Sequence, residues 1–248
     1  MDALAPADML GQLAADGAAL RAAATDLDAD VPTCPGWTVR DAVAHTATVY
    51  AHKATIIEGS LDGPPADWPP AFDYSDVRDF YDEQLHRVIE ALRTRDPATS
   101  VWTWYPPEQT VGFWVRRMMQ ETVIHRADVE SAGGPIGPVP DAVAVDGIDE
   151  LVERMLCNDD EDYYEGYSPG TGQRVSITAA GSAWTITLGP KVASFTREAT
   201  TDADAAIDGE AGHVLLALWN RLPYSAVNST GDEDALAALR SLVAVATQ

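Results

Sequence analysis

Apolar residues recur at helical spacing over most of the first half of the chain. Four segments, residues 7–27, 38–59, 75–95 and 111–131, carry apolar side chains every three or four residues. This spacing is typical of amphipathic helices that bury one face. Breaks rich in Pro and Gly separate the segments. Four amphipathic helices joined by such loops predict an antiparallel four-helix bundle.

The pattern changes after residue 140. The stretch "GGPIGPVP" at 133–140 has the composition of a linker, and one more helix is predicted over 142–156. Short alternating stretches then predict a small, mostly antiparallel sheet, at 174–181, 183–190, 192–199 and 204–210. Helices are expected at 211–222 and 232–246, with a strand at 225–230. We therefore expect a helical domain over 1–140 and an α+β domain over 141–248.

Composition limits the partners of the protein. The 248 residues carry a net charge of −23, which repels nucleic acid and anionic membranes. No apolar run is long enough to span a bilayer, and no signal-peptide pattern opens the chain. The two cysteines, Cys34 and Cys157, form neither a C-x-x-C motif nor a disulfide framework, and the lack of a framework fits a reducing cytoplasm. We expect a cytoplasmic monomer or homodimer that binds neither nucleic acid nor membrane.

Metal-ligand residue types occur on the apolar face of the fourth predicted helix. That face consists of Trp114, Met118, Glu121, His125 and Val129, which follow one another at steps of three or four. Glu121 and His125 are four residues apart and therefore adjacent on the helix surface. An ionised carboxylate on a buried face costs several kcal/mol unless it is paired or bound to a metal.

The second predicted helix places another histidine inward. Its apolar face is expected to include His45 and His52, which lie about 10 Å apart along the axis and so do not share one ion. His45, Glu121 and His125 would form a His₂Glu set, a known ligand class for a divalent metal with open positions. The same spacing also fits a hydrogen-bonded core histidine beside an intrahelical Glu–His ion pair, so it leaves both interpretations open.

Three motifs in a fixed order resemble a known family. They are "CPGWTVRDAVAH" at 34–45, "ETVIHRADVE" at 121–130 and "AVAVDGIDEL" at 142–151. Together they resemble the mycothiol-dependent maleylpyruvate isomerase family, a branch of the DinB-like metalloenzyme superfamily. The resemblance covers the helical domain and the following helix, and it continues more weakly to "LLALWNR" at 215–221.

The resemblance implies a DinB-like four-helix bundle followed by a small α+β domain. It also implies a divalent metal, usually zinc, held by His45, Glu121 and His125. The family's C-terminal domain contributes an arginine to the active site, and the place of Arg221 in "LLALWNR" makes it the candidate here.

The implied chemistry uses mycothiol, a low-molecular-weight thiol, as a metal-bound thiolate. The thiolate adds to an electrophilic small molecule, giving either cis–trans isomerisation or S-transfer, while Arg221 binds a substrate carboxylate. The alternative is a non-catalytic protein on the same fold that binds a metal or a small molecule.

Two other features have simpler interpretations. Cys34 lies just before a predicted helix start, where a thiol pKa is lowered, but its "CPGW" turn better fits a role in setting the entry to the helix. The acidic run "NDDEDYYEG" at 158–166 lacks the spacing of a calcium loop and predicts a solvated segment.

Overall fold

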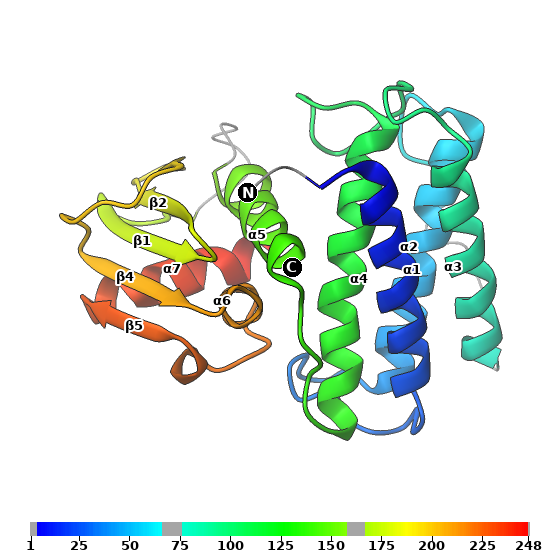
Figure 1. Ribbon diagram of the computed structural model, residues 1–248, viewed down its shortest axis with the longest axis horizontal. Coiled ribbons are helices and arrows are strands. Elements are labelled where there is room, and N and C mark those ends of the chain that lie inside the picture. Colours follow the sequence, from blue (N-terminus) through cyan, green and yellow to red (C-terminus); the bar gives the residue numbers. More distant parts are fainter. Residues whose placement is uncertain (1–3, 66–75, 158–166, 248) are drawn as a thin grey trace. The chain divides into compact units, whose positions relative to one another are not determined.

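The chain folds into two units, Leu4–Gly137 and Pro138–Gln248 (Figure 1). The computed structural model describes residues 4–65, 76–157 and 167–247. The acidic run at 158–166 therefore lies outside the described residues. Within the described part of the chain, no helix has both the length and the apolar character needed to cross a membrane.

The N-terminal unit consists of four helices. They are α1 (Pro6–Ala23), α2 (Val39–Gly59), α3 (Val77–Arg93) and α4 (Val111–Gly133). The side chain of Thr38 accepts a hydrogen bond from the backbone N–H of Asp41, whose carboxylate accepts one from the Thr38 N–H, so a capping box begins α2. Thr110 caps α4 by accepting from the N–H of Phe113.

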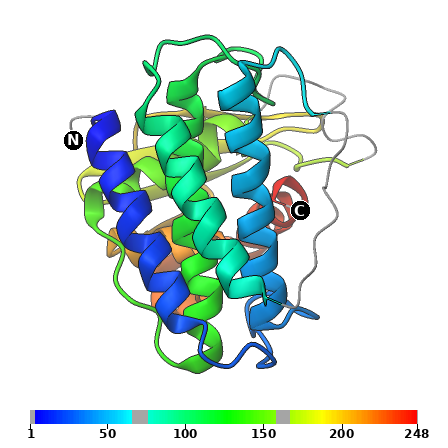
Figure 2. The ribbon, with the colours of Figure 1, turned by 90° about the vertical axis from the view of Figure 1, so that its right-hand side faces the viewer.

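The helices form a ring in the order α1–α4–α2–α3, which can be followed in Figures 1 and 2. Apolar side chains fill the centre, among them the fully buried Leu13, Tyr50, Tyr81 and Trp114. The phenol of Tyr50 on α2 hydrogen-bonds the hydroxyl of Thr122 on α4 at 2.6 Å. Because both groups are buried, this bond fixes how the two helices lie against each other.

Helix α1 ends four residues earlier than the periodicity predicts, at Ala23 rather than residue 27. The carboxylate of Asp26 accepts a hydrogen bond from the N–H of Asp28, a local turn that competes with helix. The guanidinium of Arg78 on α3 donates to the carbonyls of Ala24 and Thr25. The carbonyls beyond the helix end are therefore satisfied by a side chain from another helix.

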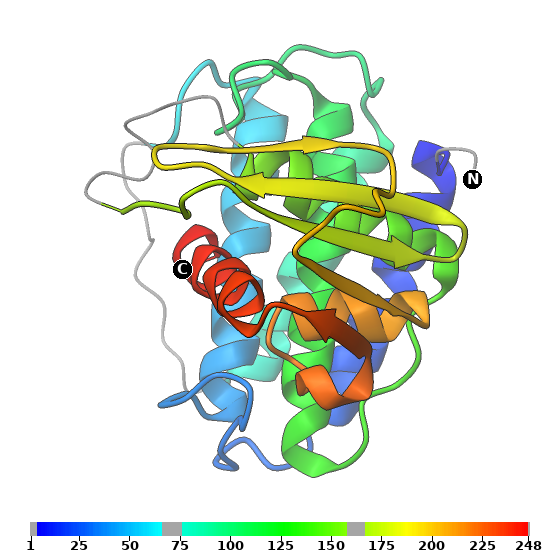
Figure 3. The same ribbon diagram turned by 90° about the vertical axis from the view of Figure 1, so that its left-hand side faces the viewer.

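The C-terminal unit combines helices with one five-stranded sheet in the order β3–β2–β1–β4–β5 (Figure 3). The strands are β1 (Gln173–Ala179), β2 (Ser182–Leu188), β3 (Ala193–Thr196), β4 (Ala205–Gly209) and β5 (Asn228–Gly231). Neighbouring strands are antiparallel except β1 and β4. The predicted mostly antiparallel sheet is therefore confirmed.

Cross-strand pairs build the apolar face of this sheet. Ile177 lies opposite both Trp184 on β2 and Ile207 on β4, and Val175 lies opposite Ile186. All five side chains are buried, and their alternate positions along each strand place them on one face of the sheet.

Three helices complete the C-terminal unit: α5 (Asp141–Glu150), α6 (Ala211–Leu218) and α7 (Glu233–Ala246). Helix α5 was predicted to run to residue 156, but residues Leu151–Leu156 form the wider turn of a π-helix, η2. The last predicted strand is displaced, because Tyr224–Ala226 form the 3₁₀ turn η3 before β5 begins. The predicted fold class, a four-helix bundle followed by a small α+β domain, is confirmed.

Candidate metal centre

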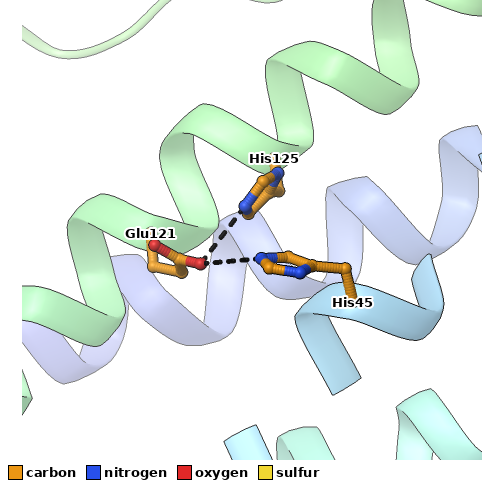
Figure 4. Close-up of side chains that lie close together, drawn as sticks. All are labelled: His45, Glu121 and His125. Carbon is orange, nitrogen blue, oxygen red and sulfur yellow. Dashed lines mark hydrogen bonds and ion pairs between the residues drawn. The ribbon is translucent and has the colours of Figure 1, made fainter. Parts of the chain in front are cut away.

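Three side chains from two helices converge inside the N-terminal unit. His45 comes from α2, and Glu121 and His125 come from α4 (Figure 4). Glu121 Oε1 lies 3.5 Å from His45 Nε2 and 3.2 Å from His125 Nε2. One ligand atom from each residue lies within 4.8 Å of the others, and no second cluster of this kind occurs among the described residues.

The local sequence explains the convergence. The capping box that begins α2 places His45 in the second turn of that helix. Glu121 and His125 share one face of α4 because they are four residues apart. The Tyr50–Thr122 bond joins the two helices next to Glu121, so it holds His45 opposite the pair on α4.

Glu121 is held as an anion. Its second oxygen, Oε2, accepts a hydrogen bond from the guanidinium of Arg117 at 3.1 Å, which leaves Oε1 facing the two imidazoles. Burial opposes ionisation, but His125, His45 and Arg117 together outweigh it and hold the pKa of Glu121 well below its usual range. The cluster therefore contains a fixed negative charge.

A second carboxylate orients His125. Its Nδ1 lies 3.0 Å from Oδ2 of Asp128, a residue that is completely buried, and Asp128 Oδ1 accepts a bond from Thr33 Oγ1 at 2.7 Å. Because Nδ1 faces Asp128, Nε2 is the nitrogen directed at Glu121. Burial lowers the pKa of His125, but Glu121 and Asp128 outweigh this effect and raise it to about 9.

These residues fit a divalent metal. Two imidazole nitrogens and one carboxylate oxygen form a ligand set that leaves coordination positions open. A cation would replace the proton that His125 otherwise carries on Nε2, and it would compensate Glu121. A carboxylate on the far nitrogen of a ligating histidine, as Asp128 provides, is the usual partner that fixes the ring in metal sites. The donor set does not discriminate among zinc and related divalent ions.

The prediction that His45 points inward is wrong in part. Its side chain is 40% exposed, against 18% for Glu121 and 10% for His125. His45 lies at the edge of the buried face of α2, where the ring of Trp37 packs 5.0 Å from its own. A residue at this edge reaches α4 and still leaves one side of the cluster open to a ligand.

His52 is buried, as predicted, and takes no part in the cluster. Its Nδ1 lies 2.7 Å from the ammonium of Lys53, and burial lowers its pKa to about 4, so it is a neutral imidazole. His86 on α3 is exposed.

Asp128, Thr33 and Trp37 were not assigned to the site from the sequence. A carboxylate three residues after a ligand histidine is a weak signal for Asp128, because i,i+3 neighbours share a helix face. Thr33 and Trp37 belong to the "TCPGW" turn, whose backbone bonds join Val31 to Cys34 and Cys34 to Trp37. The turn also contains Gly36 at φ 89°, a conformation that glycine adopts readily. Cys34 thus belongs to a turn that places two residues against His125 and its partner.

Arg221 lies in the C-terminal unit, directly after α6. Asn220 takes the left-handed conformation at φ 59°, and the N–H groups of Asn220 and Arg221 bond the carbonyls of Ala217 and Leu216. This pattern is a Schellman end, for which Asn is a common alternative to Gly. The Arg221 guanidinium donates to the carbonyl of Trp219 at 2.7 Å. Its predicted role in binding a substrate carboxylate stays a prediction.

Comparison with known families gives two matches. The family model for the mycothiol maleylpyruvate isomerase N-terminal domain matches residues 10–130. The family model for the MDMPI C-terminal domain matches residues 142–238. The first match includes His45, Glu121 and His125. No curated protein matches the chain in sequence.

Two solved structures share the fold. A crystal structure of the mycothiol-dependent maleylpyruvate isomerase is 12% identical, with a TM-score of 0.66 over 94% of this chain and 97% of that chain. A variant of that isomerase with one histidine replaced by alanine is 13% identical, with a TM-score of 0.68 over the same shares, 94% and 97%. At these identities the likeness shows the fold.

Replacing either histidine should remove the metal without unfolding the bundle. His45→Ala and His125→Ala each delete one of three ligands, while the apolar core stays intact. We expect purified wild-type protein to carry about one divalent ion per chain by elemental analysis and each variant to carry less than about a tenth of one. His86→Ala, an exposed histidine on α3, is the matched control and should keep the wild-type content. Full metal content in either ligand variant would contradict the assignment.

Asp128→Asn should weaken metal binding although Asp128 is not a ligand. The amide keeps the shape but loses the charge that orients His125, so zinc affinity should fall about tenfold or more in a competition assay with a chromogenic chelator. An exposed carboxylate on α3 offers the control, as Asp82→Asn should leave the affinity unchanged. Equal affinities for Asp128→Asn and the wild type would show that Asp128 is structural only.

Proposed function

Because the chain belongs to the mycothiol maleylpyruvate isomerase family, we propose that it is a metal-dependent enzyme that uses mycothiol to act on an electrophilic small molecule. The observation that carries the proposal is the meeting of His45, Glu121 and His125 around a common centre, with His45 partly exposed. An accessible ligand set suits catalysis, because a purely structural metal site is closed.

The protein side chains have distinct tasks in this proposal. His45, Glu121 and His125 would hold the metal, which lowers the pKa of a bound thiol and so makes it a nucleophile at neutral pH. Arg117 keeps Glu121 from turning away, since it occupies Oε2. Asp128 keeps His125 Nε2 directed at the centre.

The thiol chemistry allows two outcomes. A thiol that adds to an electron-poor cis double bond forms a carbon–sulfur bond and leaves a carbon–carbon single bond, which rotates. Elimination of the thiol then restores the double bond in the trans form, which is isomerisation. If the adduct is released instead, the reaction is S-transfer. Both outcomes need the same thiol site, so they differ only in the pocket that holds the electrophile.

We assign substrate anchoring to Arg221. A guanidinium binds a carboxylate through two parallel hydrogen bonds, which fixes orientation as well as charge. The "LLALWNR" stretch ends α6 in the Schellman turn, so the backbone of Arg221 is held in a defined conformation.

Mass spectrometry after incubation with mycothiol and electrophilic alkenes tests the proposed function. An isomerase returns a product of unchanged mass with altered alkene geometry, whereas a transferase returns an adduct heavier by one mycothiol. The His125→Ala variant should give neither product. A wild-type protein that binds metal but yields neither product with any electrophile tried would favour a non-catalytic binding protein.

Arg221→Ala should raise the KM for a carboxylate electrophile about tenfold or more, since a charge-assisted bidentate contact is lost. Metal content should not change, because the ligands all lie in the other unit. Arg174→Ala is the matched control, as Arg174 forms a surface pair with Asp202 in the same unit, and it should behave like the wild type. Unchanged kinetics in Arg221→Ala would exclude the assigned role.

A further inference from the structure

Lys53 is one of only two lysines in the chain, and it lies half-buried on α2. Its ammonium approaches His52 Nδ1 at 2.7 Å and lies 4.7 Å from the ring centre of Trp114 on α4. An ammonium has three donors and no acceptor, so His52 must accept this bond. Among the described residues, Lys53 forms no ion pair with a carboxylate.

A half-buried cation without a counter-ion is unfavourable unless a ligand supplies one. Burial lowers the pKa of Lys53 to about 8, with the charge of Glu121 acting against this effect and that of Arg117 adding to it. Lys53 is therefore within electrostatic range of both residues, yet Arg117 already bonds Glu121. Two cations thus lie near one carboxylate whose oxygens are both engaged.

Lys53 and the metal-ligand cluster lie along the same line of contact between α2 and α4. His45 contacts Glu121, and Lys53 contacts Trp114, seven residues earlier on α4. The two helices are therefore antiparallel here, and Lys53 is about two turns from His45. Arg117 lies on α4 between Trp114 and Glu121. A cationic region thus adjoins the cluster on the side of Trp114.

Aromatic and neutral groups surround this region. Trp102 packs against both His52 and Trp114, with ring centres 6.4 Å and 6.3 Å apart, and Trp114 donates its indole N–H to the carbonyl of Trp102. The ring of Trp114 covers part of the Lys53 ammonium and so strengthens its attraction for an anion. A bound carboxylate would accept hydrogen bonds from the N–H groups of Lys53 that do not bond His52.

We propose that Lys53, supported by Arg117, forms an anion subsite between α2 and α4 that binds a carboxylate of the electrophile. The subsite rests on the proposed function and gives the substrate carboxylate a specific contact on α2. It adds an anchor in the N-terminal unit to the one assigned to Arg221. The net charge of −23 gives the protein a field that does not attract anions. Recognition of an anion therefore depends on local cations such as Lys53.

Calorimetric titration of the metal-loaded full-length protein with succinate tests the subsite. Succinate carries carboxylates but has no double bond, so binding is measured without thiol or turnover. Succinamide is the neutral probe of similar shape. Lys53→Met keeps the apolar stem and removes the charge, and Lys53→Arg restores a cation. Lys191→Met removes the only other lysine, which is exposed in the C-terminal unit, and serves as the matched control.

We expect Lys53→Met to weaken succinate binding about tenfold, as loss of a charge-assisted hydrogen bond requires, and to leave metal content and succinamide binding unchanged. Lys53→Arg and Lys191→Met should bind succinate within about threefold of the wild type. Lys53→Gln provides a second neutral variant if Lys53→Met does not fold.

Two results would overturn the subsite: unchanged succinate binding in the neutral variants, or an equal loss for succinate and succinamide. A protein that binds succinate through Lys53 but gives no product with mycothiol retains the subsite and loses the proposed reaction. A protein that forms product with mycothiol but binds succinate independently of Lys53 retains the proposed reaction and loses the subsite.

Discussion

The burial of one carboxylate between two imidazoles is the constraint on which the site depends. Glu121 remains charged inside the bundle because His45 and His125 face one of its oxygens and Arg117 bonds the other. A buried charge that loses a partner destabilises a protein by about 3–5 kcal/mol, so each of these side chains is held in place by the others. A divalent cation would bind all three side chains at once and leave room for a further ligand.

The rest of the N-terminal unit positions these atoms. The Tyr50–Thr122 bond holds α2 against α4, the capping box sets where α2 begins, and Asp128 fixes the ring of His125. Their effect is to limit the freedom of the ligands, which is what a metal site needs before the ion arrives. Lys53 differs from these groups, because its partners His52 and Trp114 are neutral and the proposed anion would complete its contacts.

The sequence predicted the helical bundle, the linker and the small sheet, because hydrophobic periodicity reports which face of an element is buried. It also selected His45, Glu121 and His125, since ligand residues on apolar faces contradict that periodicity. The structure brings these three together, while metal binding itself stays a prediction. The exposure of His45 and the partner role of Asp128 were not predictable, as both depend on how α2, α4 and the "TCPGW" turn meet. At the early end of α1, the carbonyls beyond the helix are likewise satisfied by Arg78, from a helix distant in the sequence.

Anomalous diffraction at the metal absorption edge, from crystals of the protein grown with zinc, tests the central claim most directly. The ligand assignment predicts one peak within about 2.0–2.2 Å of His45 Nε2, His125 Nε2 and an oxygen of Glu121. A zinc peak bound by other residues would contradict it. So would the absence of a peak among these three side chains in crystals saturated with zinc.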